Sequence, residues 1–362
     1  MALANNAEPF KVGFLDEGPW GSPENFEQGP GMALRIRFEE AFASGELDRP
    51  VELVFAHTQG LPSGTAHAVR EGWRSLAEQG ALAIIGPGIT DNCIAVVDLF
   101  EAAHVPTINF PGTTRSRGQY GFHYQLGALY DDGPIIARAI ASAGFTEVAV
   151  IRDHSPIGQE FFEFFLEECE SKALNITCDV KCSPIATEFA SIVDHVRSAN
   201  PQVLVYLGYG QVLLDLSRAL AAADWIPPRY TVSAGMHWYS KTSKERAVLS
   251  GWIYVDQVDE ENVVLRHLVE ACRARSGADG FSPMFGTMYD VATLVVLGLR
   301  FATVHTPEGV KEGLERIHLV PSALGASGTV MGFGPFERTA LKGKDYLLLR
   351  QMQGDVTIRH IP

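Results

Sequence analysis

Two polar loops, at residues 88–92 and 111–114, carry the residue types that bind small molecules. The first reads GITDN and the second reads PGTT. Backbone N–H groups at the start of a helix favour an anion, so Thr90, Asp91 and Asn92 are candidate ligand contacts. Thr90 or Asp91 would equally serve as the N-cap of that helix. Thr113 and Thr114 would equally form a polar turn.

Charged side chains near these loops suggest further binding chemistry. Arg115 and Arg117 follow the second loop, and a guanidinium fork suits a carboxylate or a phosphate when it is not simply solvated. Two acidic runs, at residues 131–132 and 259–261, lie where helices are expected to begin. We expect these acids to stabilise helix N-termini rather than to do acid–base catalysis.

The motifs of several enzyme classes are absent from the sequence. No GxGxxG follows the first predicted strand, and no GxxxxGK[ST] occurs. The run GASG at residues 325–328 is not a GxSxG motif, and no HExxH is present. The sequence therefore predicts a protein that is not an enzyme, with no catalytic residues, no cofactor and no metal.

Composition limits the possible partners. The net charge of −14 argues against nucleic acid, and no continuous apolar run approaches the roughly 18–20 residues of a membrane helix. The five cysteines form no disulfide framework, so free thiols are expected. The start, MALANNAEPF, has no signal-peptide pattern. We predict a periplasmic or cell-envelope protein if a signal was trimmed, and a cytoplasmic one if Met1 is the native start.

Strand and helix patterns alternate along most of the chain, which is typical of an α/β fold with parallel sheets. Strands are expected at residues 11–15, 51–56, 82–86, 105–110, 147–153, 175–180, 203–207, 230–233 and 251–255. Helices are expected at residues 24–43, 65–79, 92–104, 159–171, 188–199, 211–223, 260–276, 284–302 and 307–317. Residues 345–352 and 356–360 read as a closing hairpin. So many strands predict two similar lobes, with chain crossings near residues 123–128, 255–260 and 329–336.

Several short motifs, taken in order, resemble the type I periplasmic binding proteins, in the branched-chain amino-acid (Leu/Ile/Val)-binding branch of ABC-transporter receptors. They are KVGFL at 11–15, ALAIIGP at 81–87, VPTINFPGTT at 105–114, VAVIRDHSPIG at 148–158, PQVLVYLGY at 201–209 and MYDVA at 288–292. Together they extend from about residue 10 to residue 352. The family also contains cytoplasmic sensors such as the amide-binding regulators.

The resemblance implies two Rossmann-like lobes with parallel-sheet cores, joined by a three-strand hinge. The first lobe would hold residues 1–125 and 260–330, and the second residues 126–259 and 331–362, with the ligand in a cleft between them. It also implies a set of ligand contacts: Thr90, Asp91, Asn92, Thr113, Thr114, Tyr130, Ile157 and Tyr209. Three further candidate contacts, Trp20, Met236 and His237, come from the aromatic and apolar character of the loop after the first predicted strand and of the turn at residues 234–239.

The turn that follows the strand at 230–233 departs from the amino-acid binders. That family places an acid there for the ligand's ammonium group, whereas this turn reads AGMHWY. A buried ammonium without a partner is costly. The sequence therefore predicts a bulky apolar or aromatic carboxylate ligand rather than an amino acid.

The sequence as a whole predicts a solute-binding receptor that closes on a small organic molecule and presents it to an ABC permease. The alternative is a cytoplasmic ligand-sensing regulator of the amide-binding type that signals to a protein partner. Neither function involves nucleic acid or embedding in a membrane.

Overall fold

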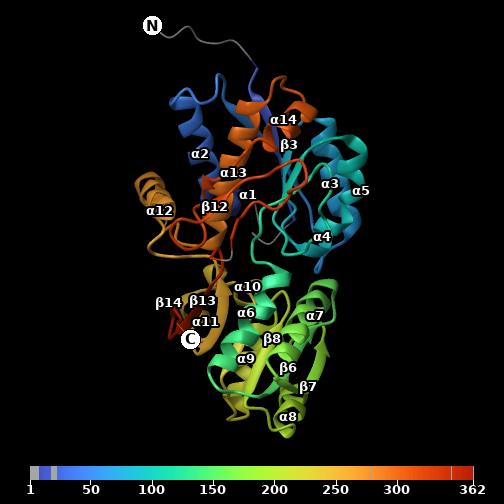
Figure 1. Cartoon of the computed structure of the whole chain (residues 1–362), viewed down its shortest axis with the longest axis vertical. Coiled ribbons are helices and arrows are strands. Elements are labelled where there is room, and N and C mark those ends of the chain that lie inside the picture. Colours follow the sequence, from blue (N-terminus) through green and yellow to red (C-terminus); the bar gives the residue numbers. More distant parts are fainter. Residues whose placement is uncertain (1–7, 18–22, 278, 344, 362) are drawn as a thin grey trace. The chain divides into compact units, whose positions relative to one another are not determined.

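The computed structural model describes residues 8–17, 23–277, 279–343 and 345–361 (Figure 1). The chain forms two compact units: unit 1 is Met1–Gln125 with Val258–Tyr346, and unit 2 is Leu126–Gln257 with Leu347–Pro362. The first two crossings fall inside the predicted segments. The third lies after Tyr346, not at 329–336, because residues 330–341 pair within unit 1 through β11 (Val320–Pro321), β12 (Val330–Met331) and the bridge from Thr339 to His123.

Unit 1 is built on a five-stranded parallel sheet in the order β2-β1-β3-β4-β5. The strands are β1 (Phe10–Asp16), β2 (Val51–His57), β3 (Ala83–Ile85), β4 (Thr107–Asn109) and β5 (Gly121–His123). Almost all of β1 and the whole of β3 and β4 are buried, as expected for parallel strands covered on both faces. The sequence did not predict β5.

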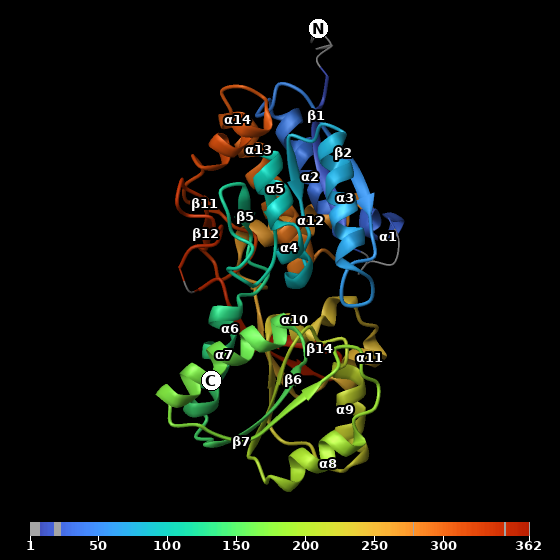
Figure 2. The same ribbon diagram turned by 90° about the vertical axis from the view of Figure 1, so that its right-hand side faces the viewer.

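Helices cover both faces of this sheet. They are α1 (Pro23–Gln28), α2 (Gly31–Ala43), α3 (Ala66–Glu78), α4 (Thr90–Ala95), α5 (Val97–Ala103), α12 (Val263–Ser276), α13 (Pro283–Phe301) and α14 (Pro307–Leu314). Helices α3 and α5 contact each other on the same side of the sheet (Figure 2). They share one apolar layer, which includes Trp73 and Phe100. Two predicted helices are each split: 24–43 at Gly29 and Pro30, where proline removes an N–H donor, and 92–104 at Val96.

Helix α13 corrects one sequence-based prediction. By length and composition it is a helix that could cross a membrane, although no such run was expected. Of its most apolar stretch, 78 % is buried inside the protein, and the helix packs against α2 and α14. Helix α13 therefore has the environment of a core helix of unit 1.

Unit 2 contains a seven-stranded sheet in the order β14-β13-β10-β9-β8-β6-β7. Its parallel strands are β6 (Glu147–Asp153), β7 (Asn175–Cys182), β8 (Val203–Leu207), β9 (Arg229–Thr231) and β10 (Trp252–Asp256). The antiparallel strands β13 (Leu348–Gln353) and β14 (Val356–Arg359) form the predicted hairpin beside β10.

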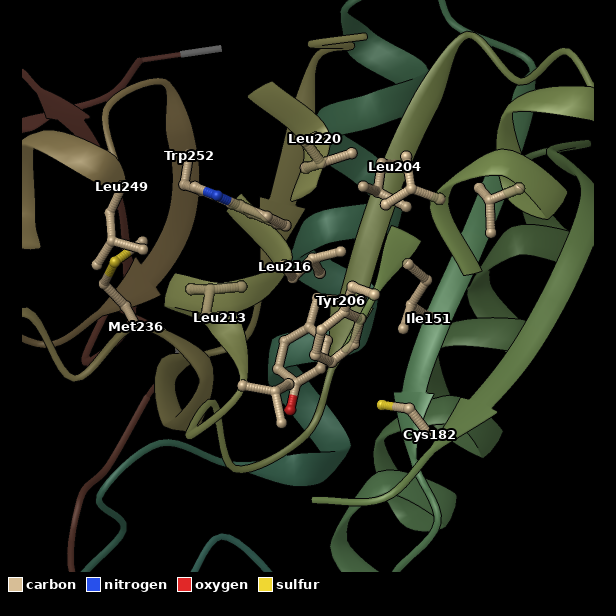
Figure 3. Packing of buried hydrophobic residues seen from close by; sticks show 14 of the residues in the cluster. Ile151, Cys182, Leu204, Tyr206, Leu213, Leu216, Leu220, Met236, Leu249 and Trp252 are labelled. Atoms are coloured by element: carbon tan, nitrogen blue, oxygen red, sulfur yellow. The ribbon is translucent and has the colours of Figure 1, made fainter. Parts of the chain in front are cut away.

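The helical elements of unit 2 are α6 (Leu129–Ser142), α7 (Pro156–Ser171), α8 (Ala190–Ser198), α9 (Leu213–Ala222), α10 (Ser233–Met236), η1 (Trp238–Ser240) and α11 (Ser243–Val248). The extent of helix α6 was not predicted, although the acids at residues 131–132 were expected to lie at a helix start. A buried apolar layer joins β6, β8, β10 and α9, with Tyr206, Leu216 and Trp252 near its centre (Figure 3). The Trp252 indole donates to Ser217 Oγ at 2.9 Å, which satisfies a buried polar pair.

The two units share one strand plan. In the orders β2-β1-β3-β4-β5 and β7-β6-β8-β9-β10, the second strand in sequence pairs on one side of the first strand, β1 or β6, and the third strand pairs on its other side. Ligands of open α/β sheets bind outside the carboxyl ends of the strands where the strand order reverses in this way. The predicted α/β fold with two parallel-sheet cores is confirmed, and each core has its own edge where a ligand site is expected.

Candidate functional site

A buried carboxylate, Glu17, lies at the strand reversal of unit 1. It follows β1 directly, and its Oε1 accepts hydrogen bonds from the backbone N–H groups of Gly88 (2.6 Å) and Ile89 (2.5 Å). Its Oε2 accepts a third bond, at 2.6 Å, from the Asn92 amide. These donors belong to the loop after β3, where the sequence predicted a ligand anion. The protein's own side chain therefore holds them.

The pKa of Glu17 is raised from 4.5 to about 7. Burial is the largest cause, since a charged carboxylate loses hydration there. The three donors favour the charged form and lower the pKa, while the neighbouring charge of Asp16 raises it. The net result is an acid that changes its protonation state close to neutral pH.

Asp16, the last residue of β1, faces the neighbouring strand. Its Oδ2 lies 3.0 Å from His57 Nδ1, because the parallel register sets Asp16 beside His57 at the end of β2. Thr58 adds two bonds to the Asp16 carbonyl, one from its backbone N–H at 2.8 Å and one from its hydroxyl at 2.9 Å. Two consecutive acids thus take different partners at this edge.

The predicted contacts of the first loop are the opening residues of α4. Ile89 is the N-cap and has no side-chain cap bond, so the expected capping by Thr90 or Asp91 is wrong. Thr90 and Asn92 are buried. Besides its bond to Glu17, the Asn92 side chain accepts from Leu61 N at 3.0 Å and donates to Leu61 O at 3.2 Å. Asn92 therefore connects the Glu17 carboxylate to the loop that contains Leu61.

The second predicted loop forms the polar turn that was weighed against ligand contact. Thr113 is buried, and its hydroxyl accepts from Arg115 N at 3.1 Å. Thr114 and Arg115 are exposed, and the Thr114 carbonyl accepts from Arg117 N at 3.3 Å. Trp20, the remaining candidate in unit 1, lies outside the described residues.

The corresponding carboxylate of unit 2 is Asp153, the last residue of β6. Its Oδ1 accepts from the Tyr206 hydroxyl at 2.6 Å, and its Oδ2 accepts from the backbone N–H of Tyr209 at 2.7 Å. The Tyr206 hydroxyl in turn accepts from Gly210 N at 3.2 Å. Burial raises the pKa of Asp153. The sequence predicted Tyr209 as a contact but missed Asp153.

The turn after β9 brings the predicted contact His237 together with the predicted contact Tyr209, which follows β8, and with Tyr239. The ring of His237 lies edge-on to Tyr209, with 4.8 Å between ring centroids, and its Nδ1 is 2.9 Å from the Tyr239 hydroxyl. The adjacent Trp238 donates from Nε1 to Asp256 Oδ2 at 2.9 Å. Burial lowers the pKa of His237 to about 4, so this imidazole is neutral at neutral pH.

The other candidates of unit 2 take two kinds of position. Met236 is 1 % exposed and lies in the core layer beside Leu249 (Figure 3), and Ile157 is also buried. Tyr130 is half-buried on α6 and lies edge-on to Phe164.

An acid that the sequence analysis assigned to a helix start reaches the turn after β9. Asp132 Oδ1 accepts from Ala128 N at 3.0 Å, which is the expected stabilisation of the start of α6. Its Oδ2 also accepts from the backbone N–H (2.8 Å) and the hydroxyl of Ser233. Burial raises the pKa of Asp132 to about 6. The turn after β9 contains no acid in its own sequence, but Asp132 of α6 places a carboxylate at Ser233.

Within the described ranges, no three His, Cys, Asp or Glu side chains are grouped to hold a metal ion. The polar groups at the strand ends are hydrogen-bonded carboxylates in both units, together with a neutral imidazole and aromatic rings in unit 2. Such groups orient and enclose a small organic molecule.

Two α/β units with polar groups at their strand ends define a class of ligand-binding proteins, and a family model identifies which one. The model described as "periplasmic binding protein" matches residues 9–340. The chain belongs to this family, whose members bind solutes, and the predicted family membership is confirmed. Among curated proteins, none matches the chain.

Solved structures share the fold at low identity. A type 1 periplasmic binding protein from Bordetella pertussis is 16% identical, with a TM-score of 0.83 over 98% of this chain and 100% of that one. The branched-chain amino-acid binding protein LivJ from Streptococcus pneumoniae, in complex with isoleucine, is 15% identical, with a TM-score of 0.81 over 97% and 98%. An ABC-transporter solute-binding protein from Rhodopseudomonas palustris, in complex with 3,4-dihydroxybenzoic acid, is 17% identical, with a TM-score of 0.76 over 95% and 93%.

Proposed function

We propose that this chain is the solute-binding receptor of an ABC-type importer, and that it captures a small organic molecule by closing its two units on it. The observation that carries the proposal is the repetition, in a member of the periplasmic binding proteins, of one polar strand-end edge in both units. Glu17 and Asp153 mark these edges. The motifs of the enzyme classes considered above are absent, which supports binding rather than catalysis.

The ligand that we propose has a bulky apolar or aromatic body. The rings of Tyr209, His237 and Tyr239 supply a surface that suits such a body, since aromatic side chains bury large areas with few rotatable bonds. The neutral His237 adds one directed polar group without a charge. Two proteins that share the fold were solved with isoleucine and with 3,4-dihydroxybenzoic acid, so the fold itself accommodates both kinds of molecule.

A thermal-shift screen of amino acids, aromatic and alicyclic acids, their amides and related amines tests the proposal. A ligand that binds only the folded state raises its stability by roughly 2.7 kcal/mol at a hundredfold excess over Kd. We expect hits among aromatic or bulky compounds, and a loss of at least about tenfold in affinity in Tyr209→Ala, measured by calorimetry.

Phe336→Ala, which truncates a fully exposed ring, is the control and should bind like the wild type. A screen in which only branched-chain amino acids bind would contradict the proposed ligand class. A screen without any hit would contradict the receptor function.

We propose the periplasm or cell envelope as the compartment and an ABC permease as the partner. The second candidate is a cytoplasmic ligand-sensing regulator, which the five free thiols favour, because unpaired cysteines are typical of reducing compartments. Fractionation of cells that express the natural gene separates the two. Recovery with the periplasmic marker supports the receptor, and recovery with the cytosolic marker supports the regulator.

A further inference from the structure

The strand-end edge of unit 1 already contains a carboxylate. Glu17 is only 7 % exposed, and its two oxygens accept from Gly88 N, Ile89 N and Asn92 Nδ2. Two converging N–H groups and an amide are a typical arrangement for binding a carboxylate. A ligand carboxylate that approached these donors would have to displace Glu17 from all three.

Neighbouring residues hold the Asn92 side chain in the position from which it donates to Glu17. The Asn92 amide is fixed on its other side by both backbone groups of Leu61. A Cβ atom at Gly60 would lie 2.4 Å from Asn92 Nδ2, so glycine is required for the close packing of this loop on the amide. The donor geometry therefore does not depend on Glu17 alone.

The charges around Glu17 are also negative. The charge of Asp16 acts on Glu17 and raises its pKa. Glu17 and Asp91 both lie close enough to Cys93 to raise the pKa of its thiol. Among the described residues, the groups that donate to Glu17 are uncharged, so a second anion would meet repulsion at this edge.

We propose that Glu17 is a built-in occupant of the carboxylate-binding donors of unit 1, and that it selects ligands whose polar end at this unit is uncharged or cationic. This proposal rests on the proposed receptor function. It replaces the carboxylate end that the sequence predicted with an amide, amine or hydroxyl. A carboxylate retains acceptor capacity beyond three bonds, so Glu17 can accept a bond from such a group.

Chemical rescue with acetate tests the occupancy without knowledge of the natural ligand. Glu17→Ala leaves the three donors and a space of carboxylate size. We expect 100 mM acetate to raise the melting temperature of this variant by about 2–4 °C, whereas acetamide, which has the same shape without the charge, should raise it by no more than about 1 °C.

Wild type and Glu78→Ala, which removes an exposed acid at the end of α3, should not respond to acetate. An equal acetate response in the wild type, or a folded Glu17→Ala protein that acetate does not stabilise, would overturn the proposal. If Glu17→Ala does not fold, its refolding yield is compared instead. A higher yield in acetate than in acetamide supports the proposal, and equal yields overturn it.

Matched acid and amide forms of each hit from the ligand screen test the selection. We expect the wild type to bind the amide at least about tenfold tighter, and Glu17→Ala to reverse this preference. Unchanged preference in the variant would overturn the selection. A screen without hits would reject the receptor function, while acetate rescue would still decide the occupancy of the edge.

Discussion

The strand-end edges of the two units place an acid at the same point of the same strand order but hold it differently. In unit 2 the last residue of the first parallel strand, Asp153 of β6, accepts a bond from the loop after the neighbouring strand, β8. In unit 1 the equivalent residue, Asp16, turns to His57 on the other side. Glu17, one residue later and one methylene longer, reaches the loop after β3 instead. The shared strand order thus places an acid at the end of the first strand in each unit. The local sequence decides which groups donate to it.

The donors differ in kind as well. Glu17 is held by two backbone N–H groups and an amide, whereas Asp153 is held by one N–H group and the Tyr206 hydroxyl. A hydroxyl can turn and can also accept, and Tyr206 accepts from Gly210 N. Main-chain donors can only donate. The donors of unit 1 therefore suit an anion, which Glu17 supplies, whereas the hydroxyl of unit 2 can adapt to either polarity.

The largest loss of stability is expected at Gly208, where there is no room for a side chain beside Asp153. A Cβ atom at Gly208 would lie 2.3 Å from Asp153 Cγ. Gly208→Ala should lower the stability of unit 2 by about 3–4 kcal/mol, measured by urea unfolding with probes in each unit. Gly334→Ala, whose Cβ would meet its nearest neighbour at 3.8 Å, is the control. A normal unit 2 transition in Gly208→Ala would show that the Asp153 edge tolerates displacement.

A pH effect of intermediate size is expected from Glu17 in unit 1. The pKa of Glu17 rises from 4.5 to about 7 on folding, so the folded state keeps a proton that the unfolded state has lost. Stability should therefore fall as pH rises from about 4.5 through about 7, by on the order of 2–3 kcal/mol for this group. Asp132 and Asp290, with pKa raised to about 6, act in the same direction.

Melting temperatures at about pH 5.5 and about pH 8 measure this effect. Glu17→Gln, which cannot ionise, should reduce the difference, and Glu78→Ala should leave it unchanged. A Glu17→Gln protein with the full wild-type difference would mean that the buried acids of unit 2 and Asp290, rather than Glu17, set the pH dependence.

The smallest effect is expected from the adaptable donor of unit 2. Tyr206→Phe removes one of the two described bonds to Asp153 and the acceptor of Gly210 N. We expect a loss of about 1 kcal/mol, measured as a shift in the urea midpoint. Tyr230→Phe, at a buried tyrosine in β9, is a matched control for hydroxyl removal. A loss as large as that of Gly208→Ala would mean that the Tyr206 hydroxyl is not an adaptable donor but holds Asp153 in one position.

Much of the fold was predictable because it depends on local pattern. Strands β6 and β8 begin and end at the predicted residues, since an apolar run bounded by turn formers is read within a few residues. The pairings at the edges were not predictable in the same way. Glu17 and Gly88 are 71 residues apart, and Asp132 and Ser233 are 101 apart. No short-range signal marks such pairs.

The candidate site was predicted in part for the same reason. The loops were found because polar residues follow buried strands, and Tyr209 and His237 do come together. The loop at residues 88–92 does supply donors to an anion, which in this structure is the Glu17 carboxylate, and its contact with a ligand stays a prediction. The position of Glu17 directly after the first strand could have indicated its role, because an acid is costly to bury there unless hydrogen-bond donors surround it.

The third crossing has a consequence for synthesis on the ribosome. Strand β13 pairs with β10, and the Gly251 N–H donates to the Met352 carbonyl at 2.7 Å, so the sheet of unit 2 includes a strand that is translated only after all the residues of unit 1. Unit 1 has all its residues once Tyr346 has been made. A nascent chain that stops at Gln257 contains all the parallel strands but lacks α13, the core helix of unit 1, and the β13–β14 hairpin of unit 2. The order of translation therefore allows unit 1 to have all its residues before β13 can pair with β10.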